Sequence, residues 1–133
     1  MTMKNFCYLQ KLFSSILNFK IPNSIFMIIY NVTSNIDNAI HEKWLVWIKE
    51  HIPQVLATGC FTEAKLTKVL VEEELGGVTY SVQYRAKSRE ALDHYYKNHA
   101  DVLRQDALKQ FADKVLAFRT ELEVIDEYSV TFD

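Results

Sequence analysis

The alternation of hydrophobic and polar positions predicts four β-strands in this chain. The first run is rich in β-branched and aromatic side chains. The other three alternate with a period of two, which gives a strand one apolar and one polar face. Gly76 and Gly77 separate the second and third runs and predict a hairpin between them. The strands are expected at residues 28–33, 61–72, 78–86 and 117–125.

Two helices are predicted where apolar residues recur every three or four positions. The first is expected to begin after Ser34 and Asp37, which are spaced like a capping box, and to end near Pro53. The second is expected as one long helix that follows Ser88 and runs to about Lys114. The apolar stripe of the first helix is formed by Ile36, Ile40, Trp44, Trp47, Ile48 and His51.

The order strand–helix–strand–strand–helix–strand is that of a ferredoxin-like α+β fold. It predicts a four-stranded antiparallel sheet with two helices on one face, and the apolar faces of the third and fourth strands are expected beneath these helices. The opposite face is then polar. Tyr30 is the alternative to Asn31 on this face, because both faces of the first strand contain isoleucine. The candidate residues of the polar face are Asn31, Ser81, Gln83, Arg85, Arg119 and Glu121.

This polar face allows two interpretations. If a second copy of the chain covers it, its polar groups become buried and must be paired, which they could achieve across a homodimer. Alternatively, the same groups line a pocket that binds a small polar or aromatic ligand. We prefer the interpretation as a dimer interface and keep the pocket as the alternative.

Four aromatic residues carry a similar ambiguity. Trp44 and Trp47 lie on the apolar stripe of the first helix, and Tyr80 and Tyr84 lie on the apolar face of the third strand. Core packing is the first interpretation of all four side chains. An aromatic wall beside a sheet is also typical of the border of a ligand cavity, so these residues are candidate pocket aromatics.

The first 26 residues differ in charge from the rest. They contain three lysines and no acid, which gives +3, whereas residues 27–133 contain 12 basic and 17 acidic residues, which gives −5 and the total of −2. We interpret residues 1–26 as an extension and 27–133 as the ferredoxin-like domain. Met27 begins a clean strand, so the extension is upstream sequence of a mis-assigned start, a disordered or loosely helical segment, or a short amphipathic helix at a membrane surface. Lys11 interrupts its apolar run, and no stretch is long enough for a membrane span.

Composition and motifs exclude several classes of function. Of the 133 residues, 49% are hydrophobic and 24% are charged, which is typical of a globular protein. The net negative charge of the domain argues against nucleic acid as a partner. The run from His41 to Leu45 begins like a zinc-protease helix but lacks the second histidine, so no metal is expected. The chain has no glycine-rich phosphate loop or nucleophile motif, so no cofactor is expected. We expect a cytoplasmic protein.

Several short segments in order resemble a known family. They begin at Met27, His41, His51, Thr58, Gly76 and Phe118, and read MIIYNVT, HEKWL, HIP, TGCFT, GGVTYSVQY and FRTELEV. They are similar to a family of small bacterial proteins catalogued as domain of unknown function 4286. The family is in turn similar to dimeric α/β-barrel proteins, in which two ferredoxin-like sheets pack face to face. The resemblance therefore implies a fold and a homodimer, and it supplies no catalytic residues.

Taken together, these observations predict an uncharacterised homodimeric domain that is a binding or structural module. The alternative is an enzyme of the cofactor-independent monooxygenase or isomerase kind, with a pocket between sheet and helices. That alternative rests on the fold alone.

Overall fold

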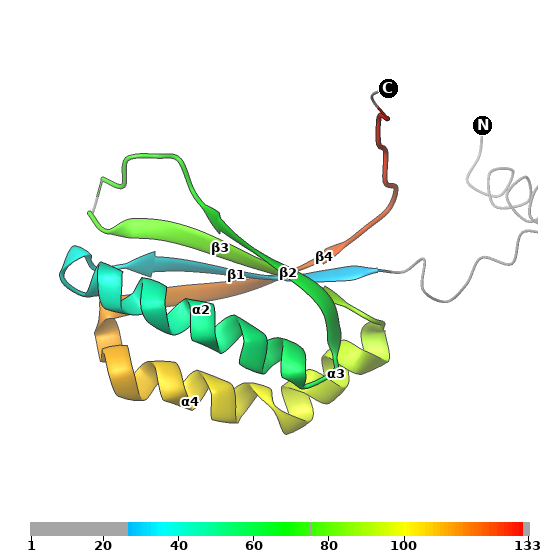
Figure 1. Ribbon diagram of the computed structural model, residues 1–133, viewed down its shortest axis with the longest axis horizontal. Coiled ribbons are helices and arrows are strands. Elements are labelled where there is room, and N and C mark those ends of the chain that lie inside the picture. The colour runs from blue at the N-terminus through cyan, green and yellow to red at the C-terminus, as the bar shows by residue number, and fades with distance from the viewer. Residues whose placement is uncertain (1–26, 75, 132–133) are drawn as a thin grey trace, which may run out of the picture.

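A computed structural model describes residues 27–74 and 76–131 of the chain. The extension expected at residues 1–26 therefore lies outside the described residues. The elements follow one another in the predicted order, with two helical segments in place of the second helix (Figure 1). They are β1 (Ile28–Ile36), α2 (His41–Ala57), β2 (Phe61–Lys68), β3 (Val78–Ala86), α3 (Arg89–Asn98), α4 (Ala100–Phe111) and β4 (Val115–Glu123).

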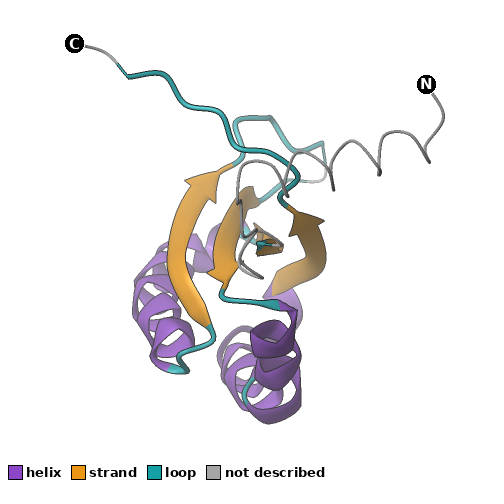
Figure 2. Cartoon of the chain, turned by 90° about the vertical axis from the view of Figure 1, so that its right-hand side faces the viewer, coloured by secondary structure: helices purple, strands orange, loops and turns teal. Residues whose placement is uncertain are grey.

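The four strands form one antiparallel sheet in the order β2-β3-β1-β4. The helices lie on one side of this sheet, and the other side has no helix among the described residues (Figures 1 and 2). The register places Tyr30 of β1 between Tyr84 of β3 and Glu121 of β4. The predicted ferredoxin-like α+β fold is confirmed, and the predicted bounds of the third strand match those of β3.

The start of the first helix differs from the prediction. β1 continues to Ile36, so Ser34 belongs to the strand and its side chain is buried against the helix layer. Asp37 caps a short 3-10 turn, Asn38–Ile40, because its Oδ1 accepts a hydrogen bond of 2.8 Å from the backbone N–H of Ala39. α2 follows this turn directly and has no side-chain cap of its own. Pro53 lies inside α2 and does not end it. Propensity alone could not separate a strand from a helix start in this polar stretch.

The second predicted helix is divided in two at His99. Ser88 caps α3 as expected, since its Oγ accepts a hydrogen bond of 3.0 Å from the backbone N–H of Ala91. The backbone of His99 leaves the helical region, and α4 then begins at Ala100. The apolar pattern runs through the break, which is why the sequence predicts one continuous helix.

The core is formed by aromatic side chains between the sheet and the helices. The ring of Tyr30 lies 6.0 Å from the rings of Phe61 and Tyr84 and 5.8 Å from that of Tyr95, measured between centroids. Such pairs each contribute about 0.5–1.5 kcal/mol beyond the burial of their area. The cluster fixes β1, β3 and α3 around one end of the helix layer.

The connection from β2 to β3 depends on Gly77. Its φ of 80° is a conformation that side chains rarely adopt, and an added Cβ would lie 2.7 Å from the backbone oxygen of Ile36. The loop therefore packs against the end of β1. β2 ends at Lys68, earlier than expected, so the connection is longer than a two-residue hairpin.

Candidate functional site

The strand register assigns every sheet residue to one of two sides. We call the side without helices the open face, and its members from β1 and β4 are Ile29, Asn31, Thr33, Asn35, Leu116, Phe118, Thr120 and Leu122. β3 contributes Thr79, Ser81, Gln83 and Arg85 to the same face, and β2 contributes Glu63, Lys65 and Thr67.

A cavity of about 80 Å³ lies on the other side, between the sheet and the helices. We call it the sheet–helix cavity. It has room for several water molecules, each of which needs on the order of 10–15 Å³ by this measure. Aliphatic side chains form much of the wall, among them Val32, Ile48, Val55, Val82, Leu103 and Val115. The polar or aromatic members are Tyr30, Ser34, Trp44, Trp47, His51, Tyr84, Tyr95, Arg104 and Arg119.

The lining of the cavity is most exposed along β4. Two of the three β4 members of its lining, Ala117 and Arg119, are exposed, whereas Val115 and the members from the other elements are buried or half-buried. Arg119 therefore lies at the mouth. Arg104, on α4, is half-buried.

Two residues of the lining carry buried nitrogens without a hydrogen-bond partner. These are His51 Nδ1 and Arg104 Nε, and they are the unpaired buried side-chain atoms among the described residues. Arg104 donates from Nη2 to the hydroxyl of Tyr30 over 3.1 Å. An unpaired buried polar group costs about 1–3 kcal/mol, and most proteins avoid it. Both of these unpaired nitrogens thus belong to residues that line the cavity.

Protonation states follow from burial. Burial lowers the pKa of His51 from its ordinary value of 6.5, and the opposing effect of nearby Asp106 is smaller, so the imidazole is neutral at pH 7. Burial raises the pKa of Tyr95 to about 12 and raises that of Tyr84 as well. Both tyrosines therefore keep their hydroxyl protons. The lining offers neutral hydrogen-bonding groups and two guanidinium cations.

Trp47 connects α2 to α4 beside the cavity. Its indole Nε1 donates to Asp106 Oδ2 of α4 over 2.9 Å, and its ring stacks on that of His51 with 4.3 Å between centroids. Hydrogen bonds from Trp47 and Gln110 lower the pKa of Asp106. Trp47 holds the imidazole in place by stacking.

The structure separates the four candidate pocket aromatics. Trp44, Trp47 and Tyr84 line the cavity. Tyr80 lies outside the lining, near the start of α2, where its hydroxyl and His41 Nε2 are 2.6 Å apart. Trp44 is also a core residue, because its side chain is only 2% exposed and its ring packs 5.0 Å from that of Tyr80.

The candidate polar-face residues from β1 and β3 lie on the open face, and most of their polar groups are paired within the chain. Ser81 Oγ donates to Asn31 Oδ1, and Asn31 Nδ2 donates to Thr33 Oγ1 over 3.3 Å. The Arg85 guanidinium forms ion pairs with Glu63 and Glu127. Gln83 lies between Asn31 and Lys65 in the register and is half-buried. Asn31, and not Tyr30, is the β1 member of this face.

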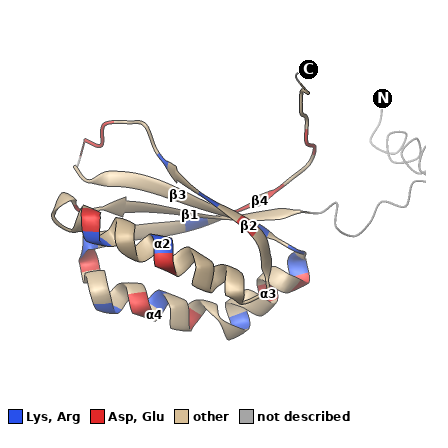
Figure 3. Ribbon diagram, viewed as in Figure 1, with Lys and Arg blue, Asp and Glu red and all other residues tan. Residues whose placement is uncertain are grey.

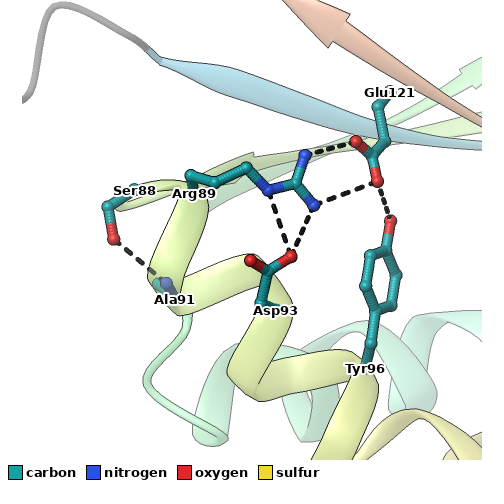
Figure 4. Close-up of polar contacts among 6 residues, drawn as sticks. All are labelled: Ser88, Arg89, Ala91, Asp93, Tyr96 and Glu121. Atoms are coloured by element: carbon teal, nitrogen blue, oxygen red, sulfur yellow. Dashed lines mark hydrogen bonds and ion pairs between the residues drawn. The ribbon is translucent and has the colours of Figure 1, made fainter.

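The expected placement of Arg119 and Glu121 is wrong. Both lie on the helix side of β4, opposite Val32 and Tyr30 of β1. Glu121 receives hydrogen bonds from Arg89 and Tyr96 of α3 (Figure 4), and these bonds lower its pKa. The alternation in β4 defines its two faces correctly, but the assumption that the apolar face lies beneath the helices fails.

The consequence is an apolar band on the open face. Leu116, Phe118 and Leu122 of β4 are 68%, 63% and 41% exposed. Ile29 of β1 lies beside Leu122 in the register. No charged residue of β1 or β4 lies on this face, and Figure 3 shows charged positions spread over the helices. Exposed apolar side chains that adjoin one another are typical of a protein interface.

Sequence reasoning missed Arg104. Ala100, Arg104, Ala107 and Phe111 recur with spacings of four, three and four, which is the pattern of the buried stripe of α4. An arginine at such a position is unusual, because arginine is seldom buried without a partner. This spacing is the signal that could have identified it.

The described residues contain no group of three metal-ligating side chains close enough to hold an ion. Cys60 is buried and forms no disulfide, in keeping with an inert thiol. None of the described helices is long and apolar enough to span a bilayer.

Several crystal structures have a similar fold at low sequence identity. A dimeric ferredoxin-like protein from an uncultured marine organism has a TM-score of 0.61 at 12% identity, over 77% of this chain and 99% of the other. A conserved protein of unknown function from Bacteroides thetaiotaomicron, described as a possible oxidoreductase, has a TM-score of 0.56 at 14% identity. The match covers 74% of this chain and 98% of the other. A putative antibiotic biosynthesis monooxygenase from Bacillus cereus has a TM-score of 0.53 at 13% identity, and the match covers 79% of this chain and 99% of the other.

These identities support a common fold and nothing more specific. A comparison with curated proteins gave no match. Residues 27–125, which include every described helix and strand, match the sequence profile of the family described as "Domain of unknown function (DUF4286)". The chain therefore belongs to the DUF4286 family.

Proposed function

We propose that this protein is a homodimeric module that binds a small molecule in the sheet–helix cavity of each subunit. The observation that carries the proposal is the pair of buried, unpaired nitrogens on His51 and Arg104, both residues of the cavity lining. A partner that arrives from outside the subunit would satisfy them and remove the cost of leaving them unpaired. Apolar walls with a few convergent polar groups are the usual composition of a ligand site.

The homodimer is proposed on the properties of the open face. A second copy that covers the apolar band of β4 would remove Leu116, Phe118 and Leu122 from water. Asn31, Ser81 and Arg85 already have partners within the chain, so burying them requires few new polar contacts. Such an interface would be isologous, with each subunit contributing the same patch. The description of one fold relative as dimeric agrees with this arrangement.

Ligand binding is tested with a panel of charged and neutral compounds of up to about six heavy atoms, the size range that a cavity of this volume suggests. Both tryptophans of the chain line the cavity, so their two indole N–H signals in a ¹H–¹⁵N spectrum report on it. We expect at least one compound to shift the Trp47 signal in a saturable way. No response to any compound would refute the binding role.

A cavity-filling variant provides the control. Ala107→Leu places a larger side chain in the lining and should abolish the response. Ala57→Leu makes the same change at an exposed position of α2 and should leave the response intact. Equal responses in the two variants would place the bound compound outside the cavity.

An enzyme that uses the same cavity is the second candidate. His51 favours it, because a histidine with a lowered pKa is unprotonated at neutral pH and so suited to accept a proton from a bound molecule. Mass spectrometry distinguishes the two candidates once a bound compound is known. A binding module returns that compound unchanged after incubation, whereas an enzyme converts it and loses the conversion in His51→Gln.

A further inference from the structure

The sheet–helix cavity concentrates positive charge in an acidic protein. The chain as a whole has 17 acidic and 15 basic residues. The lining of the cavity includes Arg104 and Arg119 but no aspartate, glutamate or lysine. A surface with this balance by chance would carry carboxylates beside its arginines. The charge of the lining therefore indicates what it binds.

The four arginines of the chain fall into two classes. Arg89 pairs with Asp93 and Glu121 (Figure 4), and Arg85 pairs with Glu63 and Glu127. Arg104 and Arg119, which line the cavity, form no ion pair with any described residue. Each arginine outside the cavity thus has two carboxylate partners, whereas those of the cavity have none within the part of the chain that the structure describes.

Arg104 keeps most of its hydrogen-bonding capacity free. A guanidinium has five N–H groups, and among described residues only the contact from Nη2 to the Tyr30 hydroxyl uses one of them. The planar fork of arginine matches a carboxylate, which accepts two parallel hydrogen bonds. Half-burial of this side chain strengthens such a contact, because water competes for it less than at the surface.

The other groups of the lining do not compete for this cation. His51 is neutral, and the hydroxyls of Tyr84 and Tyr95 remain protonated. None of them is an anion that could pair with Arg104. The hydroxyls are also potential donors to a bound oxygen atom.

The size and walls of the cavity restrict the anion. An apolar cavity of about 150 Å³ accepts benzene, so the 80 Å³ found here corresponds to a smaller molecule. Ile48, Val55, Val82 and Leu103 offer contacts to a short hydrocarbon part. We infer that the cavity binds a short-chain organic carboxylate, whose charged group pairs with Arg104 and whose hydrocarbon part contacts these side chains. This inference rests on the proposed function and narrows it to a class of ligand.

The test compares anions with neutral molecules of the same shape. Acetate, propionate and butyrate are titrated at pH 7 and constant ionic strength against acetamide, propionamide and butyramide, with inorganic phosphate as a third probe. The Trp47 indole signal is the readout, because Trp47 lines the cavity. We expect each carboxylate to bind at least about tenfold more tightly than its amide, as the loss of a charge-assisted hydrogen bond predicts.

Variants locate the charge that matters. Arg104→Gln should weaken butyrate binding about tenfold or more and leave butyramide unchanged. Lys109→Gln removes the same charge from an exposed position on the same helix and should have no effect. Arg119→Gln, at the exposed mouth, should weaken butyrate about threefold through the longer-range field. The Arg119→Gln variant also tests the inference if Arg104→Gln does not fold.

Each contrary outcome has its own meaning. Amides that bind as tightly as carboxylates would refute the inference and leave the proposed function standing. Phosphate that binds more tightly than butyrate would replace an organic carboxylate by an inorganic anion. Butyrate affinity that is unchanged in both Arg104→Gln and Arg119→Gln would also overturn the inference. If these probes and the whole compound panel leave the indole signals unmoved, the inference and the proposed function both fall.

Discussion

The two sides of the sheet treat polar and apolar groups in opposite ways. On the open face, Asn31 and Ser81 bond to each other, while Phe118 is left in water. On the helix side, the apolar side chains are packed, while His51 and Arg104 each keep a buried nitrogen without a partner. A protein surface can cover the first kind of region with few new polar contacts. The second kind requires a molecule that brings polar groups of its own.

The largest expected difference between the two sides is in the stability of the subunit. Trp44→Ala should lower the free energy of unfolding by about 3–5 kcal/mol, because it empties a buried aromatic site. Phe118→Ala should change it by less than about 0.5 kcal/mol in dilute protein, where the open face is solvated. Urea denaturation measures both. A cost for Phe118→Ala that approached that of Trp44→Ala would mean that the open face is packed within the subunit.

Formation of the proposed dimer should instead depend on the open face and not on the helix side. Phe118→Asp places a charge in the proposed interface and should raise the dissociation constant of the dimer more than about a hundredfold, which corresponds to about 3 kcal/mol. Val102→Asp makes a similar change on α4, at a side chain that is 74% exposed, and should leave the dimer intact. Arg119→Glu should also leave it intact, because Arg119 lies on the helix side. Sedimentation equilibrium at micromolar concentration decides, and a monomeric wild-type protein would exclude the interface.

A matched pair of variants compares the polar groups of the two sides. Asn31→Val removes the partner of Ser81 and should lower the free energy of unfolding by about 1 kcal/mol. His51→Leu removes a buried polar atom that has no partner and should raise this free energy by about the same amount. Thermal or chemical unfolding without added ligand provides the measurement. A destabilised His51→Leu would contradict the expected cost of the unpaired nitrogen.

The smallest effect is a dependence on pH. Because the pKa of His51 is lowered on folding, the unfolded chain binds a proton more readily than the folded one. The wild-type protein should therefore lose stability as the pH falls below about 6.5, the ordinary pKa of histidine. His51→Leu lacks this contribution, so its advantage should grow between pH 7 and pH 5. A constant difference over that range would contradict the assignment of a neutral imidazole.

The sequence predicts some strands of the sheet better than others. The bounds of β3 are predictable because clear alternation begins directly after Gly76 and Gly77 and ends at a helix cap. β4 is an edge strand, and the pattern of its residues defines two faces without saying which one lies beneath the helices. The hydrophobic rule chose the wrong face there, because the apolar side chains Phe118 and Leu122 lie on the open face and not beneath the helices.

The cavity could not be predicted from the sequence for a different reason. His51 and Arg104 come from different helices, and no local pattern relates them. Their shared property, a buried nitrogen without a partner, exists only after the helices have packed. The spacing of Arg104 on the buried stripe of α4 could have marked it as unusual, but it could not have shown that its Nε stays unpaired.

β1 contributes to both surfaces, and this limits the changes that the chain tolerates. Tyr30 lies on the cavity side and Asn31, its neighbour, on the open face. A single inserted residue would exchange the two sets along the rest of the strand. The loop between Lys68 and Val78 belongs to neither β2 nor β3, so an insertion there would not exchange the two faces of a strand. Length variation among natural variants should therefore occur in that loop and be absent from β1.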